Sequence, residues 1–273
     1  MPKALDVAAD VTITLVGPVI QLHSLSVIFG DHVALENVSF SVRAGSACAL
    51  VGRNGAGKST CLRVLAGVQD PSAGGVAILG SAPLDGAFAK RKVGYLLDDQ
   101  ALFAYLTGAE TLHLIGELYG VASGERHTRV ASLLDFFDLK DNVEQLVENY
   151  STGMQRRLAL AAAMIHGPDV LILDEPFETL DPIMVRRLRN LLAAFVQSGG
   201  AVLVSTHLMS VIEQFCDHVV VIDGGRVLID GSMNDVLSPP ESPGRASLED
   251  VYVAAVVGGR PEPLLDWLHP RSR

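Results

Sequence analysis

Alternating apolar and polar positions near the start of the chain predict two β-strands. The alternation runs from Val19 to Phe40, is rich in β-branched residues and is broken at Gly30-Asp31, which is typical of a hairpin. Residues 75–79 and Val93–Leu97 have the composition of two further short strands. Residues 1–17 show no clear period, so we expect them to form a leader outside the folded domain.

The spacing of apolar residues becomes helical between Leu102 and Lys140. Thr107 and Glu110 have the spacing of a capping box, which predicts a helix from there to about Tyr119. A second helix is expected from about Gly124 to Phe137. Because no segment of this region favours a strand, the pattern indicates a helical subdomain.

The second half of the chain alternates between strands and helices. A helix over Met154–His166 completes the helical subdomain, which we place at about 98–167. Pro168-Asp169 ends that helix, and Val170–Leu173 is a run of four apolar residues, which predicts a strand buried on both faces. The elements expected after it are a helix with an apolar stripe over 184–195, strands over 201–205, 218–222 and 226–229, and a helix over 208–215.

The C-terminal segment reads as separate from this α/β unit. Residues 238–246 have the composition of a linker. Ser247 and Asp250 form a second capping box that begins a short helix to about Val257. We therefore expect one domain over 18–237, followed over 238–273 by the linker, this helix and a tail.

Composition narrows the class of protein. Apolar residues make up 49% of the 273 residues, but we find no unbroken apolar run of 18, the length that a membrane-spanning helix needs. The first 17 residues carry one Lys together with Asp6 and Asp10, which argues against a secretory signal. The net charge of −10 does not favour nucleic acid as a partner.

The three cysteines, Cys48, Cys61 and Cys216, are widely spaced, and we expect them to be buried thiols in a reducing compartment. Together with the lack of a long apolar run and of a secretory signal, this predicts a cytosolic protein.

The strongest local signal is the stretch from Val51 to Thr60, which follows an apolar run and precedes a helical pattern over 61–67. Strand, glycine-rich loop and helix in this order form a phosphate-binding loop. Its glycines let backbone N–H groups point inward, Lys58 can reach the β- and γ-phosphates, and the Ser59 hydroxyl can bind Mg²⁺. The alternative is a turn that only connects strand to helix. The match predicts a nucleoside triphosphate site in an α/β P-loop NTPase core. We expect this core to have a mixed, mostly parallel sheet with flanking helices, an N-terminal antiparallel β subdomain and the inserted helical subdomain.

Two carboxylates follow the buried strand. Asp174 is placed to bind Mg²⁺, and Glu175 to orient the attacking water or accept its proton. His207 ends the next strand, which puts it at the same edge of a parallel sheet, where an imidazole can donate to the γ-phosphate. The alternatives are a solvated strand end for the carboxylates and a structural polar residue for His207.

In these motifs the chain resembles the ATP-binding subunits of ABC transporters, from about Val19 to Val257. Residues 52–59 match the Walker A motif, 171–175 the Walker B motif, 180–182 the D-loop and 205–207 the H-loop. The signature motif LSGGQ corresponds to Tyr150-Ser151-Thr152-Gly153-Met154, a form similar to that of ABC-2 exporters. Asp98 stands where the Q-loop usually has Gln or Glu, and Thr179 where the D-loop commonly has Gly.

The resemblance implies how ATP and Mg²⁺ bind. Two copies of the chain would face each other head to tail, so that Ser151 and Gly153 of one copy meet the nucleotide of the other. Phe29 would stack on adenine, and Asp98 would join Ser59 and Asp174 as a metal ligand. The remaining residues implied to contact the nucleotide are Gly52, Asn54, Gly55, Ala56, Gly57, Lys58, Thr60 and Asp181.

Three functions remain open at this point. The resemblance favours an ATPase that powers an exporter, is attached to the cytoplasmic face of the membrane through separate polytopic permease subunits, and works as a homodimer. One alternative is a soluble ABC-type ATPase that acts on DNA or ribosomes, although the long coiled coil and the second cassette of such proteins are missing. The other is a nucleotide-dependent regulatory binder, which the departures at Asp98 and in the signature suggest.

Overall fold

The computed structural model describes residues 17–82, 91–97, 102–238 and 246–258. The first described strands form an antiparallel sheet in the order β2-β1-β4. Its strands are β1 (Pro18–Phe29), β2 (His32–Arg43) and β4 (Ala73–Ile78). The turn between β1 and β2 contains Gly30, whose φ is +58°, so the hairpin predicted at Gly30-Asp31 is confirmed.

A second sheet has six strands in the order β5-β6-β7-β3-β8-β9. All neighbours are parallel except β8 and β9, which confirms the expected mixed, mostly parallel sheet of a P-loop NTPase core. The strands are β3 (Ala47–Val51), β5 (Val93–Leu96), β6 (Val170–Asp174), β7 (Ala201–Ser205), β8 (His218–Asp223) and β9 (Arg226–Ser232). β9 runs three residues beyond its predicted end because it pairs with β8 along its whole length.

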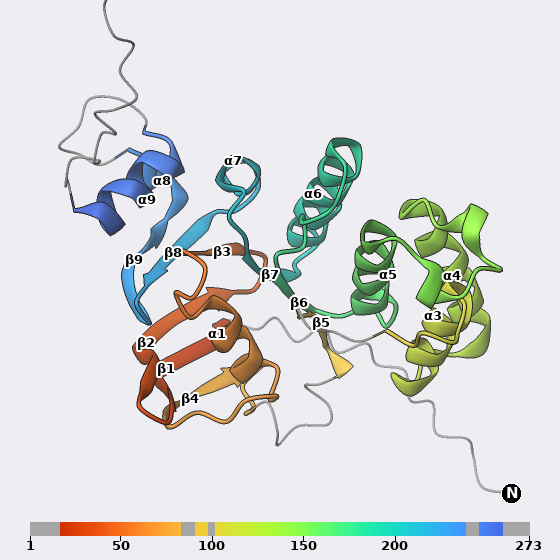
Figure 1. Ribbon diagram of the computed structural model, residues 1–273, viewed down its shortest axis with the longest axis horizontal. Coiled ribbons are helices and arrows are strands. Elements are labelled where there is room, and N and C mark those ends of the chain that lie inside the picture. Colours follow the sequence, from red (N-terminus) through yellow and green to blue (C-terminus); the bar gives the residue numbers. More distant parts are fainter. Residues whose placement is uncertain (1–16, 83–90, 98–101, 239–245, 259–273) are drawn as a thin grey trace, which may run out of the picture.

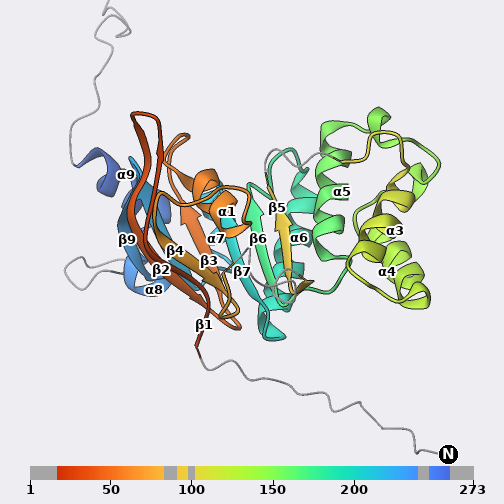
Figure 2. The same ribbon diagram turned by 90° about the horizontal axis from the view of Figure 1, so that it is seen from below.

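The helical elements between β5 and β6 gather at one end of the molecule, away from the antiparallel sheet (Figures 1 and 2). They are α3 (Gly108–Leu118), α4 (Ser123–Phe136), the short 3₁₀ turns η1 (Lys140–Asn142) and η2 (Val147–Asn149), and α5 (Thr152–Met164). Thr107 and Glu110 form the predicted capping box. α5 begins two residues earlier than expected, since Ser151 caps it by accepting a hydrogen bond from the N–H of Met154 at 3.2 Å.

The other helices are α1 (Lys58–Leu65), α6 (Pro182–Gln197), α7 (Met209–Ile212), α8 (Met233–Leu237) and α9 (Leu248–Val257). α7 is shorter than the predicted 208–215, because Gln214 and Phe215 donate to carbonyls three residues back in turns. α8 was not predicted, although Ser232 caps it: the Ser232 hydroxyl accepts a hydrogen bond from the N–H of Asp235. The capping box of Ser247 and Asp250 is confirmed at the start of α9. Among the described residues no helix is both long and apolar enough to cross a membrane.

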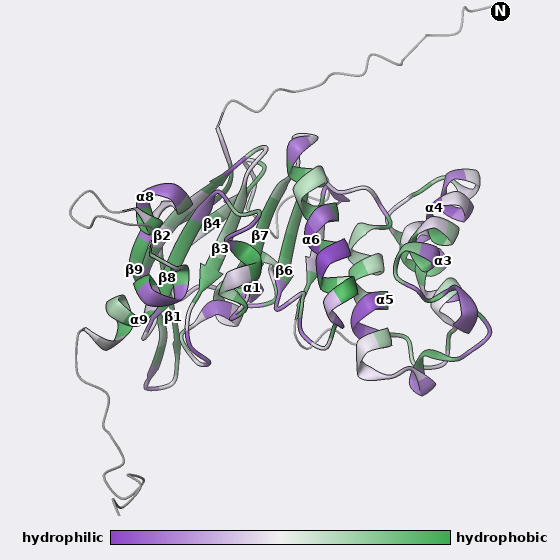
Figure 3. Ribbon diagram, turned by 90° about the horizontal axis from the view of Figure 1, so that it is seen from above, coloured by the Kyte–Doolittle hydropathy of each residue, from purple (hydrophilic) through white to green (hydrophobic). Residues whose placement is uncertain are grey.

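The central strands of the six-stranded sheet, β3, β6 and β7, are buried on both faces. Successive side chains of a strand point to opposite faces, and those of β3 belong to two different apolar clusters. Cys48 and Leu50 pack with α1 and the antiparallel sheet. Ala47, Ala49 and Val51 pack with the helices on the other face. Figure 3 shows the apolar strands β3, β6 and β7 at the centre. Since both faces are covered, only the ends of these strands are open to carry functional groups.

Candidate functional site

The glycine-rich loop joins β3 to α1 through positions that exclude side chains. A Cβ atom on Gly52 would lie 2.4 Å from the carbonyl oxygen of Ile222. Gly57 has a φ of +108°, and its Cβ would lie 2.6 Å from a methyl carbon of Leu35. An L-residue rarely adopts such a φ, and neither space admits a methyl group. The two glycines therefore let the loop turn tightly against its neighbours.

Lys58, the first residue of α1, is buried beneath this loop. Its side chain is 6% exposed, and Nζ donates to the carbonyl oxygens of Gly52 at 2.8 Å and Arg53 at 3.3 Å. A buried ammonium group needs such partners. α1 begins three residues earlier than the predicted 61–67, which places Lys58 and Ser59 in its first turn. The loop thus has a positive charge and the positive end of a helix dipole at its centre.

The outer side of the loop is attached to the end of β8. Arg53 forms an ion pair with Asp223, with an Nε–Oδ1 distance of 2.9 Å. This hydrogen bond raises the pKa of Arg53. The N–H of Gly225 donates to the carbonyl of Ala56 at 3.1 Å. These contacts connect the loop to the β8–β9 turn, so its conformation does not depend on a bound ligand alone.

Asp174 and Glu175 lie at the end of β6. Asp174 is 1% exposed and accepts a hydrogen bond from the Ser205 hydroxyl. The N–H of Glu175 donates to the carbonyl oxygen of Ser205 at 3.0 Å and to its hydroxyl at 3.1 Å. Glu175 has a φ of +46°, a conformation that is unusual for a residue other than Gly. Ser205 therefore holds both carboxylate residues at the edge of the sheet.

His207 lies beside Glu175, as the order of the strands predicts. Its Nδ1 is 3.0 Å from Oε2 of Glu175, and its N–H donates to the same oxygen at 3.3 Å. The Glu175 side chain is 15% exposed, whereas that of His207 is 55% exposed. The imidazole thus reaches solvent on one side and orients the carboxylate on the other.

One cavity of about 440 Å³ brings most of the predicted residues together. It is open on one side, and Phe29, 47% exposed, lies at the end of β1 beside it. The predicted residues that line it are Phe29, Asn54, Gly55, Gly57, Lys58, Ser59, Thr60, Asp174, Glu175 and His207. Gly52 and Ala56 belong to the same loop but do not line the cavity.

Three predicted residues lie elsewhere. Ser151 caps α5, and Gly153 is in its first turn. Asp181 caps α6 by accepting from the N–H groups of Ile183 at 2.9 Å and Met184 at 3.1 Å, and these bonds lower its pKa. None of the three lines the cavity of its own chain. Asp98 falls outside the described residues.

A comparison with known protein families finds a match that includes the glycine-rich loop and the end of β6. A model of the family described as ABC transporter matches residues 35–178. This chain belongs to the ABC transporter family. It is an ABC ATPase, so the nucleoside triphosphate that it binds and hydrolyses is ATP.

Similar proteins include named export subunits. The chain is 34% identical over 257 residues to Nod factor export ATP-binding protein I of Cupriavidus metallidurans, covering 92% of this chain and 81% of that protein. It is 35% identical over 217 residues to an uncharacterized ABC transporter ATP-binding protein of Bacillus subtilis, covering 80% and 72%.

Solved structures agree with the fold. The structure of an ATP-binding subunit of an ABC transporter has a TM-score of 0.81 and 32% identity, covering 87% of this chain and 99% of that one. A dimeric ATP-binding cassette, solved in a post-hydrolysis state with ADP and Pi, has a TM-score of 0.71 and 24% identity, covering 78% and 98%. At that identity the second match concerns the fold alone.

Sequence reasoning missed several residues around the ABC ATPase site. Arg53 and Glu178 line the cavity, and Arg156 contacts the end of β6 from α5. A third carboxylate three positions after Glu175 was a visible signal for Glu178. No local pattern indicated Arg156, because its contact joins residues that are far apart in the sequence.

The three cysteines of the ABC ATPase are free and buried, as predicted. Burial is the main cause that raises the pKa of Cys61 to about 12, and it also raises those of Cys48 and Cys216. They are therefore neutral thiols at physiological pH, and they act as small apolar side chains in the core.

Proposed function

We propose that this chain powers an exporter by binding and hydrolysing ATP between two copies arranged head to tail. One observation carries this proposal. The cavity holds the phosphate loop, both carboxylates and His207, whereas Ser151 and Gly153 at the start of α5 do not line it. A second copy that supplies these two residues would complete the site.

The cavity suits the triphosphate of ATP. The Lys58 ammonium group donates to loop carbonyls, and phosphate oxygens are acceptors of the same kind with more negative charge. The tight turn that Gly52 and Gly57 allow can direct backbone N–H groups of the loop toward the phosphates. Phe29 lies at the hairpin beside the cavity, where its ring can stack on the adenine base.

The residues present also fit Mg²⁺. The Ser59 hydroxyl and the Asp174 carboxylate line the same cavity, and oxygen ligands of this kind are those that Mg²⁺ prefers. Mg²⁺ bound to them would neutralise negative charge on the phosphates. Glu175 orients the attacking water and accepts its proton. His207 keeps the Glu175 carboxylate in place, and its exposed side can donate to the γ-phosphate.

The start of α5 is suited to bind the nucleotide of the second copy. Ser151 and Thr152 are exposed, and the first turn of a 13-residue helix offers free N–H groups and a positive dipole end. The related cassette that was solved with ADP and Pi is a dimer. We infer the same assembly here.

The helical subdomain presents a surface for the membrane subunit. A cavity of about 270 Å³ lies between β5, α3 and α5. Its lining includes Phe103, 45% exposed, and Leu118, 69% exposed. An apolar segment of a polytopic permease fits such a surface. This contact would hold the chain at the cytoplasmic face of the membrane, and the relatives named as export subunits favour transport out of the cell.

Co-purification tests the coupling to a permease. We expect the full-length chain, isolated from native membranes after mild solubilisation, to carry a polytopic membrane protein at a stoichiometric ratio. A variant with Phe103→Ser and Leu118→Ser should lose that partner and keep its own ATP binding, because these side chains lie away from the nucleotide cavity. Recovery with ribosomes or DNA in place of a membrane protein would contradict the transport function.

A substitution of Phe29 tests the adenine contact. Phe29→Ala should raise the KM for ATP by roughly 5- to 150-fold, since stacking of a base on an aromatic ring contributes about 1–3 kcal/mol, and should change kcat little. Ile28→Ala is the matched control, as Ile28 is equally exposed on the same strand (48% against 47%) but does not line the cavity. Steady-state kinetics with ATP gives both constants. An unchanged KM in Phe29→Ala would exclude the stacking role.

A further inference from the structure

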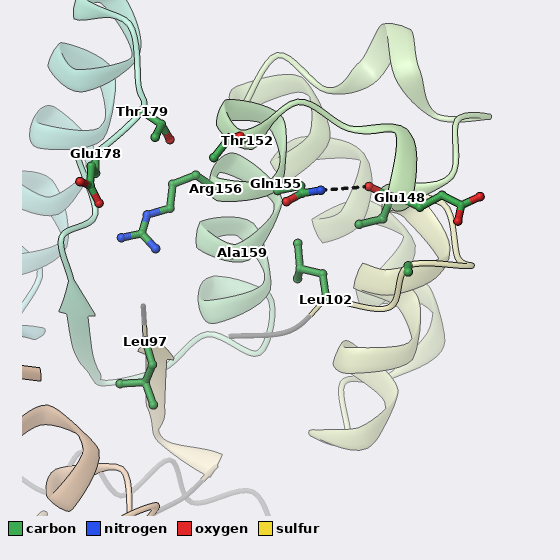
Figure 4. Close-up of a pocket in the computed structure, with 11 residues that line it drawn as sticks. Leu97, Leu102, Glu148, Thr152, Gln155, Arg156, Ala159, Glu178 and Thr179 are labelled. Carbon is green, nitrogen blue, oxygen red and sulfur yellow. Dashed lines mark hydrogen bonds between the residues drawn. The ribbon is translucent and has the colours of Figure 1, made fainter. Parts of the chain in front are cut away.

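Arg156 projects from the second turn of α5 toward the end of β6. One terminal nitrogen of its guanidinium group donates to the carbonyl oxygen of Asp174 at 2.5 Å and to that of Glu175 at 2.6 Å. Figure 4 shows the side chain extending from α5 toward the segment that carries Glu178 and Thr179. It lines a cavity of about 320 Å³ between these elements.

The two acceptors are the carbonyl oxygens of Asp174 and Glu175, whose side chains are proposed to bind Mg²⁺ and to activate the attacking water. β6 ends at Asp174, and beyond it Glu175 takes a positive φ of +46°. A backbone conformation of this kind persists only when surrounding contacts hold it. Ser205 supplies the bonds on the N–H side of Glu175, and Arg156 supplies those on the carbonyl side.

Two hydrogen bonds anchor the guanidinium group to the end of β6. Both come from one terminal nitrogen, and the buried Nε has no hydrogen-bond partner in the described part of the chain. Arginine donors to carbonyl oxygens are charge-assisted and stronger than neutral hydrogen bonds. A displacement of Arg156 would therefore change the direction in which the Glu175 side chain leaves the backbone.

We propose that Arg156 is a positioning residue for hydrolysis, which holds Glu175 in its productive conformation from α5. This inference rests on the proposed function, because α5 is also the helix whose first turn is proposed to meet the nucleotide of the second copy. Arg156 lies five residues after Ser151, on the second turn. It touches neither substrate nor metal, and it acts through the backbone of Asp174 and Glu175.

Kinetics of single variants give the first test. Arg156→Gln in the full chain should lower kcat roughly 10- to 100-fold, as expected when a group that orients a catalytic residue is lost, while KM and nucleotide affinity stay within about twofold. Arg156→Lys keeps the charge and can donate to one carbonyl, so it should recover part of kcat. It is also the variant to compare if glutamine prevents folding.

Arg129→Gln is the matched control. Arg129, on α4, also donates to a backbone carbonyl of the helical subdomain, that of Ile165 at 2.8 Å, and pairs with Glu125. Ile165 follows the C-terminal end of α5, so this contact is far from the end of β6 that Arg156 reaches. A kcat like that of the parent is expected for it. Equal losses of kcat in Arg129→Gln and Arg156→Gln would show a general effect of the helical subdomain and overturn the inference.

Mixed dimers show which carboxylate Arg156 serves. One copy carries Glu175→Gln, so single-turnover hydrolysis reports only the intact Glu175 of the other copy. Arg156→Gln in the copy with the intact Glu175 should slow hydrolysis roughly 10- to 100-fold, whereas in the other copy it should change the rate by less than about twofold. Equal rates for both placements would overturn the inference. A mixed dimer with both arginines intact that hydrolyses nothing would instead overturn the proposed function, and this inference with it.

Discussion

Glu175→Gln is expected to reduce steady-state ATP hydrolysis by roughly 10²- to 10⁴-fold, the usual contribution of a general base. Glutamine has nearly the same shape and can still accept a hydrogen bond from His207, but it cannot take a proton from water. Lys58 and the phosphate loop are untouched, so nucleotide affinity should remain. The variant should accumulate as an ATP-bound dimer, because the step that opens the dimer is blocked.

Two measurements check this result. Phosphate release gives the rate, and size-exclusion chromatography with light scattering gives the mass with and without ATP. Glu249→Gln provides a control with the same change of charge, since Glu249 is exposed in the first turn of α9. Hydrolysis by Glu175→Gln at the parent rate would show that the proton acceptor is another group. A loaded variant that stays monomeric at high concentration would contradict the head-to-tail dimer.

Lys58→Ala should weaken ATP binding by roughly 10- to 150-fold. A hydrogen bond to a charged group contributes about 1.5–3 kcal/mol, and each 1.4 kcal/mol is tenfold in affinity. Lys58 is 6% exposed and lies under the loop, where water screens its charge poorly. The loss of the ammonium group therefore removes the only charge buried within the described part of the loop.

Calorimetric titration with ATP in the presence of Mg²⁺ measures this effect. Lys140→Ala is the control, because Lys140 is exposed and pairs only weakly with Asp135 at 3.5 Å. Binding of ATP should raise the Tm of the parent, and Lys58→Ala should largely abolish this rise. Without nucleotide, the Tm of the variant should differ from that of the parent by far less than the rise that ATP causes. An ATP affinity equal to that of the parent would mean that Lys58 serves the fold of the loop and not the phosphates.

Much of the fold followed from periodicity. The β1–β2 alternation, the Thr107–Glu110 capping box and the apolar run ahead of Asp174 are local signals, and each predicted element is present. α7 ended early and α8 was missed, because elements of four and five residues depend on packing more than on their own periodicity.

The residues of the candidate site also differ in how directly the sequence indicated them. The phosphate loop and Asp174-Glu175 are contiguous in sequence, so their residue types revealed them directly. His207 was predicted from the order of parallel strands, which places consecutive strand ends at one edge. Thr179 adopts a φ of +61° at the position where the family commonly has Gly. A β-branched residue thus adopts the left-handed conformation at this position, two residues before the cap of α6.

The sequence alone was enough to propose which groups bind phosphate and which supply carboxylates, because those properties belong to short segments with fixed chemistry. The tertiary structure decided how they are held. Ser205 joins Asp174 to Glu175, and Asp223 holds Arg53 across 170 positions of the chain. Arg156 reaches the same peptide groups from a different subdomain. Such contacts depend on the packing of distant elements, and no local pattern of residues encodes them.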